Sequence, residues 1–123
     1  MLQGMVWGLF FAASAGAQTF VASIGGIVRD TSGAVMPGVK VTVTNIHTNV
    51  ATSTMTNAEG NYFVPFLPVG VDRVSFLKAG FKEQVHQDIT LVMNQKFRLD
   101  VVLQVGQSTQ IVTVTGSATQ LNR

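Results

Sequence analysis

An alternation of apolar and polar residues begins near residue 20 and continues almost to the end of the chain. In the segment 39–46, three valines fall on one face of an extended chain, and Lys40, Thr42 and Thr44 fall on the other. A period of two residues is typical of β-strands that bury one face. No helical period appears after residue 20, so the sequence predicts an all-β fold.

Turn signals rich in Gly, Pro, Asn and Asp interrupt the alternation every eight to twelve residues. Roughly seven strands in about 85 residues favour a β-sandwich. We therefore expect a seven-stranded antiparallel β-sandwich, stabilised mainly by burial of the aligned Val, Leu, Ile and Phe faces. The seven expected strands cover residues 20–29, 39–46, 50–56, 62–66, 71–77, 88–93 and 96–104, and a final β-rich segment covers residues 110–115.

Glycine and proline mark the corners between these strands. Asp30 is expected to accept hydrogen bonds from nearby backbone N–H groups, and Gly33 is free to take a positive φ. Proline pre-sets φ at a corner, and glycine lets the chain turn into the next strand. The expected structural turn residues are Asp30, Gly33, Pro37, Gly38, Gly60, Pro68, Gly70 and Gly80.

The N-terminus has the features of an export signal over residues 1–17. The apolar run Met5 to Ala17 ends in Ala15-Gly16-Ala17, which fits the small-residue cleavage pattern, so Gln18 would begin the mature chain. No charged side chain precedes Arg29. A signal peptide normally begins with positive side chains, so we expect the natural start to lie upstream. A buried N-terminal strand or helix is the alternative.

Charge is sparse and evenly spread. Eight Lys and Arg against six Asp and Glu give a net charge of +2, and charged residues make up 11% of the chain. Nucleic-acid binding requires a concentrated basic footprint, often with stacking aromatic residues beside it. The interleaved charges lack such a footprint, so nucleic acid is excluded as a partner.

No constellation of catalytic or metal-binding residues stands out. The two histidines, His47 and His86, have no Cys to join in a zinc site and are expected at the surface. Asp30 and Glu59 lie in turns that could share one end of the sandwich, where turn capping is favoured over weak calcium binding. The nucleophile elbow, the phosphate loop and the dinucleotide fingerprint are missing. The sequence predicts a protein that is not an enzyme and has no cofactor.

The order and spacing of the turn residues resemble the carboxypeptidase regulatory-like domain over about residues 24–104. This resemblance implies a transthyretin-like (Ig-like) sandwich. The zinc and catalytic residues of the peptidase belong to a different domain, so the resemblance implies no catalysis. The motifs that carry it are Gly26-x-Val28-x-Asp30-x-x-Gly33-Ala34-x-x-Pro37-Gly38-Val39-x-Val41, Thr56-Asn57-x-x-Gly60-x-Tyr62, Leu67-Pro68-x-Gly70 and Gly80-Phe81.

The segment Gln110 to Gly116 resembles the sequence that leads into the plug of TonB-dependent outer-membrane receptors. In one large bacterial group of these receptors, a regulatory-like sandwich precedes the plug and the barrel. The implied organisation is a signal at 1–17, a sandwich at 20–105, and a linker or the start of a plug-like region at 106–123. The alternative for 110–116 is one more strand of the sandwich.

Two functions follow from these features. The first is an accessory domain, on the periplasmic face of the outer membrane, of a TonB-dependent transporter of which this chain is an N-terminal fragment. Its partners would be a barrel in the same full-length chain and a TonB-type energising protein. That protein would pair with the strand formed by Ile111, Val112, Thr113, Val114 and Thr115.

The second function is a free-standing exported module, periplasmic or secreted, that binds carbohydrate or protein. Sugar sites usually present exposed aromatic rings. Because Tyr62 is expected in the core, Phe66 and Phe81 near loop ends are the candidate platforms.

Asp72 departs from the family pattern, which usually has Tyr at this position. The alternation places Asp72 on the face of Val74 and Phe76, where an unpaired carboxylate would be costly. We expect Asp72 to lie in water at a frayed strand start. Weakened local packing is the alternative.

Overall fold

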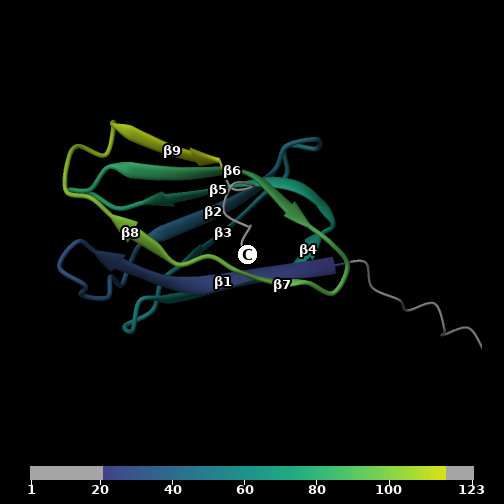
Figure 1. The fold of residues 1–123 in the computed structure, drawn as a ribbon, viewed down its shortest axis with the longest axis horizontal. Coiled ribbons are helices and arrows are strands. Elements are labelled where there is room, and N and C mark those ends of the chain that lie inside the picture. Colours follow the sequence, from purple (N-terminus) through teal and green to yellow (C-terminus); the bar gives the residue numbers. More distant parts are fainter. Residues whose placement is uncertain (1–20, 116–123) are drawn as a thin grey trace, which may run out of the picture.

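The computed structural model describes residues 21–115, which form nine strands and no helix (Figure 1). This confirms the all-β prediction. None of these residues belongs to a helix long and apolar enough to cross a membrane. The predicted export signal lies outside the described residues. The strands are β1 (Val21–Asp30), β2 (Lys40–Asn45), β3 (Ala51–Met55), β4 (Asn61–Pro68), β5 (Gly70–Leu77), β6 (Glu83–Leu91), β7 (Lys96–Arg98), β8 (Val101–Leu103) and β9 (Ile111–Thr115).

The strands form two sheets packed face to face (Figure 1). One sheet has the order β4-β1-β7, with β8 also paired to β1, and the other has the order β3-β2-β5-β6-β9. The pairs β1–β7, β1–β8 and β6–β9 are parallel, and the remaining pairs are antiparallel. The predicted sandwich is confirmed, but it is mixed and has nine described strands instead of seven antiparallel ones.

The parallel pairs follow from how the chain changes sheets. After β6 the chain leaves the second sheet, runs through the first as β7 and β8, and returns as β9. The chain reverses direction at each of these two crossings between the sheets. β9 therefore has the same direction as β6 and pairs with it in parallel.

Apolar side chains from both sheets fill the space between the layers. Ile24 and Val28 of β1 and Val74 and Phe76 of β5 are fully buried, and the ring of Tyr62 meets that of Phe76 edge to face at 5.4 Å. Burial at about 25 cal/mol per Å² makes this core the main stabilising term. Its other members are Ala22, Met36, Val39, Val41, Val43, Val64, Leu67, Ile89, Leu91, Val101 and Leu103.

A β-bulge in β4 changes which residues face the core. Ala22 of β1 pairs with Leu67, and Ile24 pairs with Val64, so β4 carries one extra residue between these pairs. Phe66 lies in this bulge with φ 60° and is 80% exposed. The bulge therefore turns a large aromatic side chain into solvent.

A second bulge lies in β6 and explains a wrong strand boundary. Asp72 of β5 pairs with Ile89, and Val74 pairs with His86, so β6 has one extra residue near Asp88, whose φ is 59°. The inward positions therefore change phase within the strand. Because the period breaks there, the sequence predicted a strand from residue 88, whereas β6 begins at Glu83.

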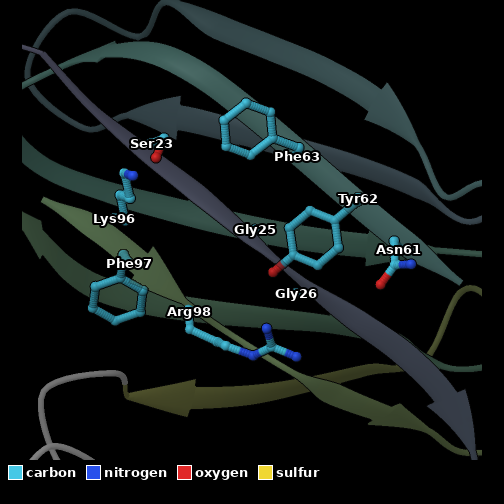
Figure 2. Close-up of a pocket in the computed structure, with 9 residues that line it drawn as sticks. All are labelled: Ser23, Gly25, Gly26, Asn61, Tyr62, Phe63, Lys96, Phe97 and Arg98. Carbon is cyan, nitrogen blue, oxygen red and sulfur yellow. The ribbon is translucent and has the colours of Figure 1, made fainter.

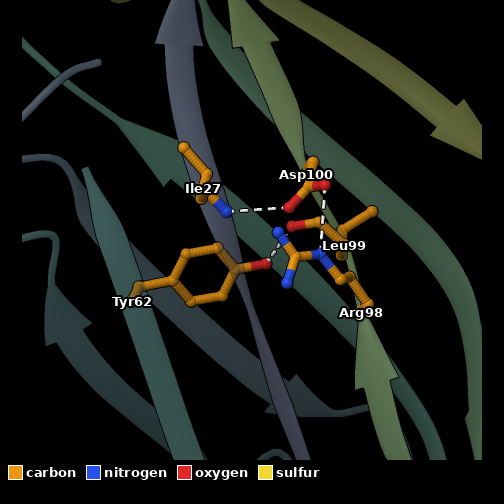
Figure 3. A network of polar contacts seen from close by, with 5 residues as sticks. All are labelled: Ile27, Tyr62, Arg98, Leu99 and Asp100. Carbon is orange, nitrogen blue, oxygen red and sulfur yellow. Dashed lines mark hydrogen bonds and ion pairs between the residues drawn. The ribbon is translucent and has the colours of Figure 1, made fainter. Parts of the chain in front are cut away.

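Polar contacts divide the predicted strand 96–104 into β7 and β8 (Figure 3). The hydroxyl of Tyr62 donates to the carbonyl of Leu99, and the N–H of Ile27 donates to Asp100 Oδ1 at 2.9 Å. Arg98 Nε pairs with Asp100 Oδ2 at 3.2 Å. Side chains thus replace part of the ladder beside β1, and the strand is interrupted at Leu99–Asp100.

Candidate functional site

The predicted turn residues lie at the corners of the sandwich. Asp30 Oδ1 accepts from the Ser32 hydroxyl at 2.6 Å and from the N–H groups of Ser32 and Ala34 at 2.8 and 3.2 Å. These hydrogen bonds lower the pKa of the Asp30 carboxyl, and the bond from the Ser32 hydroxyl has the largest effect. Pro37 and Gly38 lie before β2, and Pro68 ends β4. Five of the turn glycines have a positive φ: Gly33, Gly38, Gly60, Gly70 and Gly80.

Gly60 lies where two turns meet. A Cβ atom there would be 2.8 Å from the carbonyl oxygen of Val28 and 2.9 Å from Val35 Cβ. The turn at Asn57 to Gly60 therefore packs against the turn that follows β1. Within residues 21–115 no three His, Asp or Glu side chains gather as metal ligands.

The two histidines have different environments. His47 is exposed in the turn after β2, as predicted. His86 is only 7% exposed, so the prediction of a surface residue was wrong for it. Its Nε2 lies 2.6 Å from Gln84 Oε1, while Gln84 Nε2 donates to the carbonyl of Val102. Burial lowers the pKa of His86.

Asp72 is also more buried than the sequence predicted. The predicted register was correct, because Asp72 is on the inner face of β5 with Val74 and Phe76. The expectation of a solvated, frayed position was wrong, because Asp72 is 2% exposed. The strand remains paired through this position on both sides, with Asn45 of β2 and Ile89 of β6.

The segment predicted to bind a partner strand is β9, at the edge of the second sheet. The backbone carbonyl of Gln110 accepts a hydrogen bond from the N–H of Glu83 at 2.9 Å, which fixes the parallel register with β6. Alternation then directs the backbone groups of Val112 and Val114 toward β6, and those of Ile111, Thr113 and Thr115 outward. Among the described strands, none pairs with this outer edge. An open edge of this kind is a template for an additional strand.

A groove of about 340 Å³ lies on the outer face of the first sheet (Figure 2). Its floor is Gly25 and Gly26 of β1, with Phe63 on one side and Lys96 and Arg98 on the other. Because a Cβ at Gly25 would lie 3.3 Å from Phe63 Cδ1, the Phe63 ring rests against bare backbone. The groove therefore combines an aromatic wall with a cationic wall.

The exposed aromatic residues differ in part from those expected. Phe66 is 80% exposed, as a binding platform requires, whereas Phe81 is partly buried against the core. Tyr62 is a core residue, as predicted. Phe63 is 60% exposed and was not singled out by sequence. Its outward position follows from strand alternation once Tyr62 is placed inward.

A family comparison agrees with this architecture. The model of the carboxypeptidase regulatory-like domain matches residues 23–104, two thirds of the chain. The chain belongs to this family. The match spans β1 to β8, so both sheets of this regulatory-like domain contribute to it.

One curated relative of this regulatory-like domain is a transporter. The chain is 30% identical over 110 residues to the TonB-dependent transporter Oar of Myxococcus xanthus. The aligned region is 89% of this chain but only 10% of the transporter. The chain therefore spans about a tenth of the relative's length.

Solved structures share the fold of this regulatory-like domain. The Bacillus anthracis TIE protein has a TM-score of 0.59 and 20% identity, covering 70% of this chain and 17% of its own. Catechol 1,2-dioxygenase from an Acinetobacter species also has a TM-score of 0.59, with 12% identity. The match covers 80% of this chain and 58% of the dioxygenase. At these identities the likeness shows the sandwich fold alone, because one fold hosts unrelated functions.

Proposed function

We propose that this domain is a non-catalytic accessory module of a TonB-dependent outer-membrane transporter and faces the periplasm. The observation that carries the proposal is the 30% identity to such a transporter over 110 residues. The arrangement of the described residues supports it, because they form a packed apolar core with a strand at an open edge and gather no metal-binding cluster.

The mechanism is physical. The sandwich holds β9 at a fixed position, and a strand of the TonB-type energising protein adds to its outer edge. The outward N–H and C=O groups of Ile111, Thr113 and Thr115 supply the hydrogen bonds. The exposed side chain of Ile111 contributes to the register of the added strand. A barrel in the same full-length chain performs the transport.

A single backbone change tests strand addition. Thr113→Pro removes an outward N–H and leaves the β6-facing groups of Val112 and Val114 in place. We expect this variant to remain folded and to lose binding to the purified periplasmic domain of the organism's TonB-type protein. Thr113→Val keeps the N–H and the branched shape, so it should bind like the wild type. Equal binding by all three proteins would exclude β9 as the docking edge.

The gene itself tests the transporter context. The reading frame is followed beyond codon 123 in the genome of origin. A frame that continues into a plug and many amphipathic strands agrees with the proposal. A stop codon there, together with a soluble periplasmic product on fractionation, contradicts it.

The groove favours one alternative, an exported module that binds carbohydrate or protein. Phe63 offers an exposed ring, and Lys96 and Arg98 favour a sugar that carries carboxylates. Titration with a neutral and a uronic-acid polysaccharide tests this function. Binding of the acidic polymer that is lost in Phe63→Ala but kept in Phe66→Ala supports the alternative. If neither polymer binds, carbohydrate is excluded.

A further inference from the structure

A second cavity, of about 190 Å³, lies at the end of the sandwich where both sheets contribute to its lining. Val43 of β2, Val50 before β3, and Leu67 and Pro68 of β4 form its apolar walls. An engineered cavity of about 150 Å³ lined by apolar side chains binds benzene, so this space is large enough for one small ring.

Among the described residues of the lining, Asp72 carries the only ionisable group. Asp72 is 2% exposed, and its Oδ1 has no hydrogen-bond partner among residues 21–115. Rotation about the last side-chain torsion of an aspartate is broad and two-fold, so either oxygen can turn toward the cavity. A buried acceptor without a donor is rare in folded proteins, which makes this oxygen a place where a ligand gains a hydrogen bond.

The polar side chain that lies opposite Asp72 leaves Asp72 Oδ1 without a donor. Asn45 lies opposite Asp72 in the register of β2 and β5. Its Oδ1 is held by the N–H groups of His47 and Thr48 and by the Thr48 hydroxyl, at 2.9, 3.0 and 3.3 Å. The Asn45 side chain also makes a hydrogen bond with the Asp72 carboxyl, which offsets part of the effect of burial on its pKa. Asp72 Oδ1 nevertheless remains without a partner in the part of the chain that the structure describes.

The geometry points to this cavity as a binding site for a small apolar molecule that carries one hydroxyl group, of the size of a phenol. The ring would lie against Val43, Val50, Leu67 and Pro68, and the hydroxyl would donate to Asp72. An anionic ligand is excluded because it brings a second acceptor to a buried carboxyl. Val50 is 63% exposed and Thr52 is exposed, so these residues form the rim through which a ligand enters.

Three matched probes test the site on the wild-type protein. Titrations of 4-methylphenol, toluene and 4-methylbenzoate are followed through the backbone amide signals of residues 43–52 and 67–72 by NMR. We expect saturable shifts with 4-methylphenol, about tenfold weaker binding of toluene, and none of the carboxylate; tenfold corresponds to one ordinary hydrogen bond. Toluene binding as tightly as 4-methylphenol, or no saturable shift with any probe, overturns the proposal.

Two variants separate the roles of the carboxyl and of the space. Asp72→Leu removes the acceptor, so 4-methylphenol should lose its tenfold advantage over toluene. Thr52→Phe places a ring at the rim and should abolish binding of both probes. Its control is Ala51→Phe, on the opposite face of β3 and outside the lining, which should bind like the wild type. An undiminished preference for 4-methylphenol in Asp72→Leu contradicts the assigned role of the carboxyl.

Discussion

Asn45 and Asp72 are direct cross-strand partners between β2 and β5, yet no described residue donates a hydrogen bond to Asp72 Oδ1. Asn45 uses its amide oxygen to hold the turn that follows β2, accepting from His47 and Thr48. The same residue therefore orders a turn and leaves the neighbouring carboxyl incompletely paired. We expect this incomplete pairing to lower the stability of the domain, because a buried acceptor without a donor is costly.

Replacing Asp72 should stabilise the fold. Asp72→Leu removes a buried acceptor without a partner and should raise the free energy of unfolding at pH 7 by about 1–3 kcal/mol. Asp72→Tyr should raise the Tm as well, because its ring extends into the adjacent 190 Å³ cavity. For a domain of this size, about 1 kcal/mol corresponds to about 4–8 °C. Urea denaturation and calorimetry measure both effects.

The exposed Asp88 provides the control for these variants. Asp88 has a positive φ that Asn tolerates, so Asp88→Asn should change the stability by less than about 0.5 kcal/mol. An unchanged or lower Tm in both Asp72 variants would show that the carboxyl is compensated in the folded protein.

The pH dependence of stability should carry the signature of Asp72. Burial raises the pKa of its carboxyl above the ordinary value of 3.8. Above pH 3.8 the unfolded chain loses this proton first, so the folded state binds more protons and the stability falls as the pH rises. The penalty disappears below pH 3.8. Asp72→Leu should therefore gain most relative to the wild type at neutral pH and least near pH 3, as followed by urea denaturation.

His86 should act in the opposite direction. Burial lowers its pKa from the ordinary value of 6.5, so below pH 6.5 the unfolded chain binds the extra proton and the folded state loses stability. We expect Asp72→Leu, which lacks the opposing group, to lose stability from pH 7 to pH 5. Adding His86→Gln should reduce that loss, and adding His47→Gln, at an exposed position, should not. Equal slopes in the two double variants would contradict the assignment.

The sequence predicted the fold wherever the alternation was continuous. β2 and β5 keep one phase throughout, and their predicted limits differ from the observed ones by one residue or less at each end. β6 was misplaced because Gln84 and His86 face inward before its bulge and Ile89 faces inward after it. A bulge is defined by how a strand pairs with its neighbour. The alternation of polar and apolar residues within one strand therefore does not reveal it.

The candidate sites depend even more on tertiary pairing. The outer edge of β9 exists because β6 occupies its other side, and no local motif encodes that parallel pairing. The sequence identified Asp72 as an unusual inward residue, but its burial follows from the cover that β4 and the segment before β3 provide. Phe63 could have been found by applying the alternation to the residue after Tyr62.

Gly26 should be far less tolerant of a side chain than its neighbour Gly25. A Cβ at Gly26 would lie 2.1 Å from the carbonyl oxygen of Leu99 and 2.8 Å from Asp100 Oδ1, the two acceptors at the break between β7 and β8. A Cβ at Gly25 would approach the carbonyl oxygen of Tyr62 only to 3.2 Å. Gly26→Ala must therefore move β7 away from β1 and loosen the bond from Tyr62 to Leu99. We expect it to cost about 3 kcal/mol or more in urea denaturation, and Gly25→Ala about 1 kcal/mol or less. If both variants lose the same free energy of unfolding, the segment Leu99–Asp100 does not pack closely against Gly26.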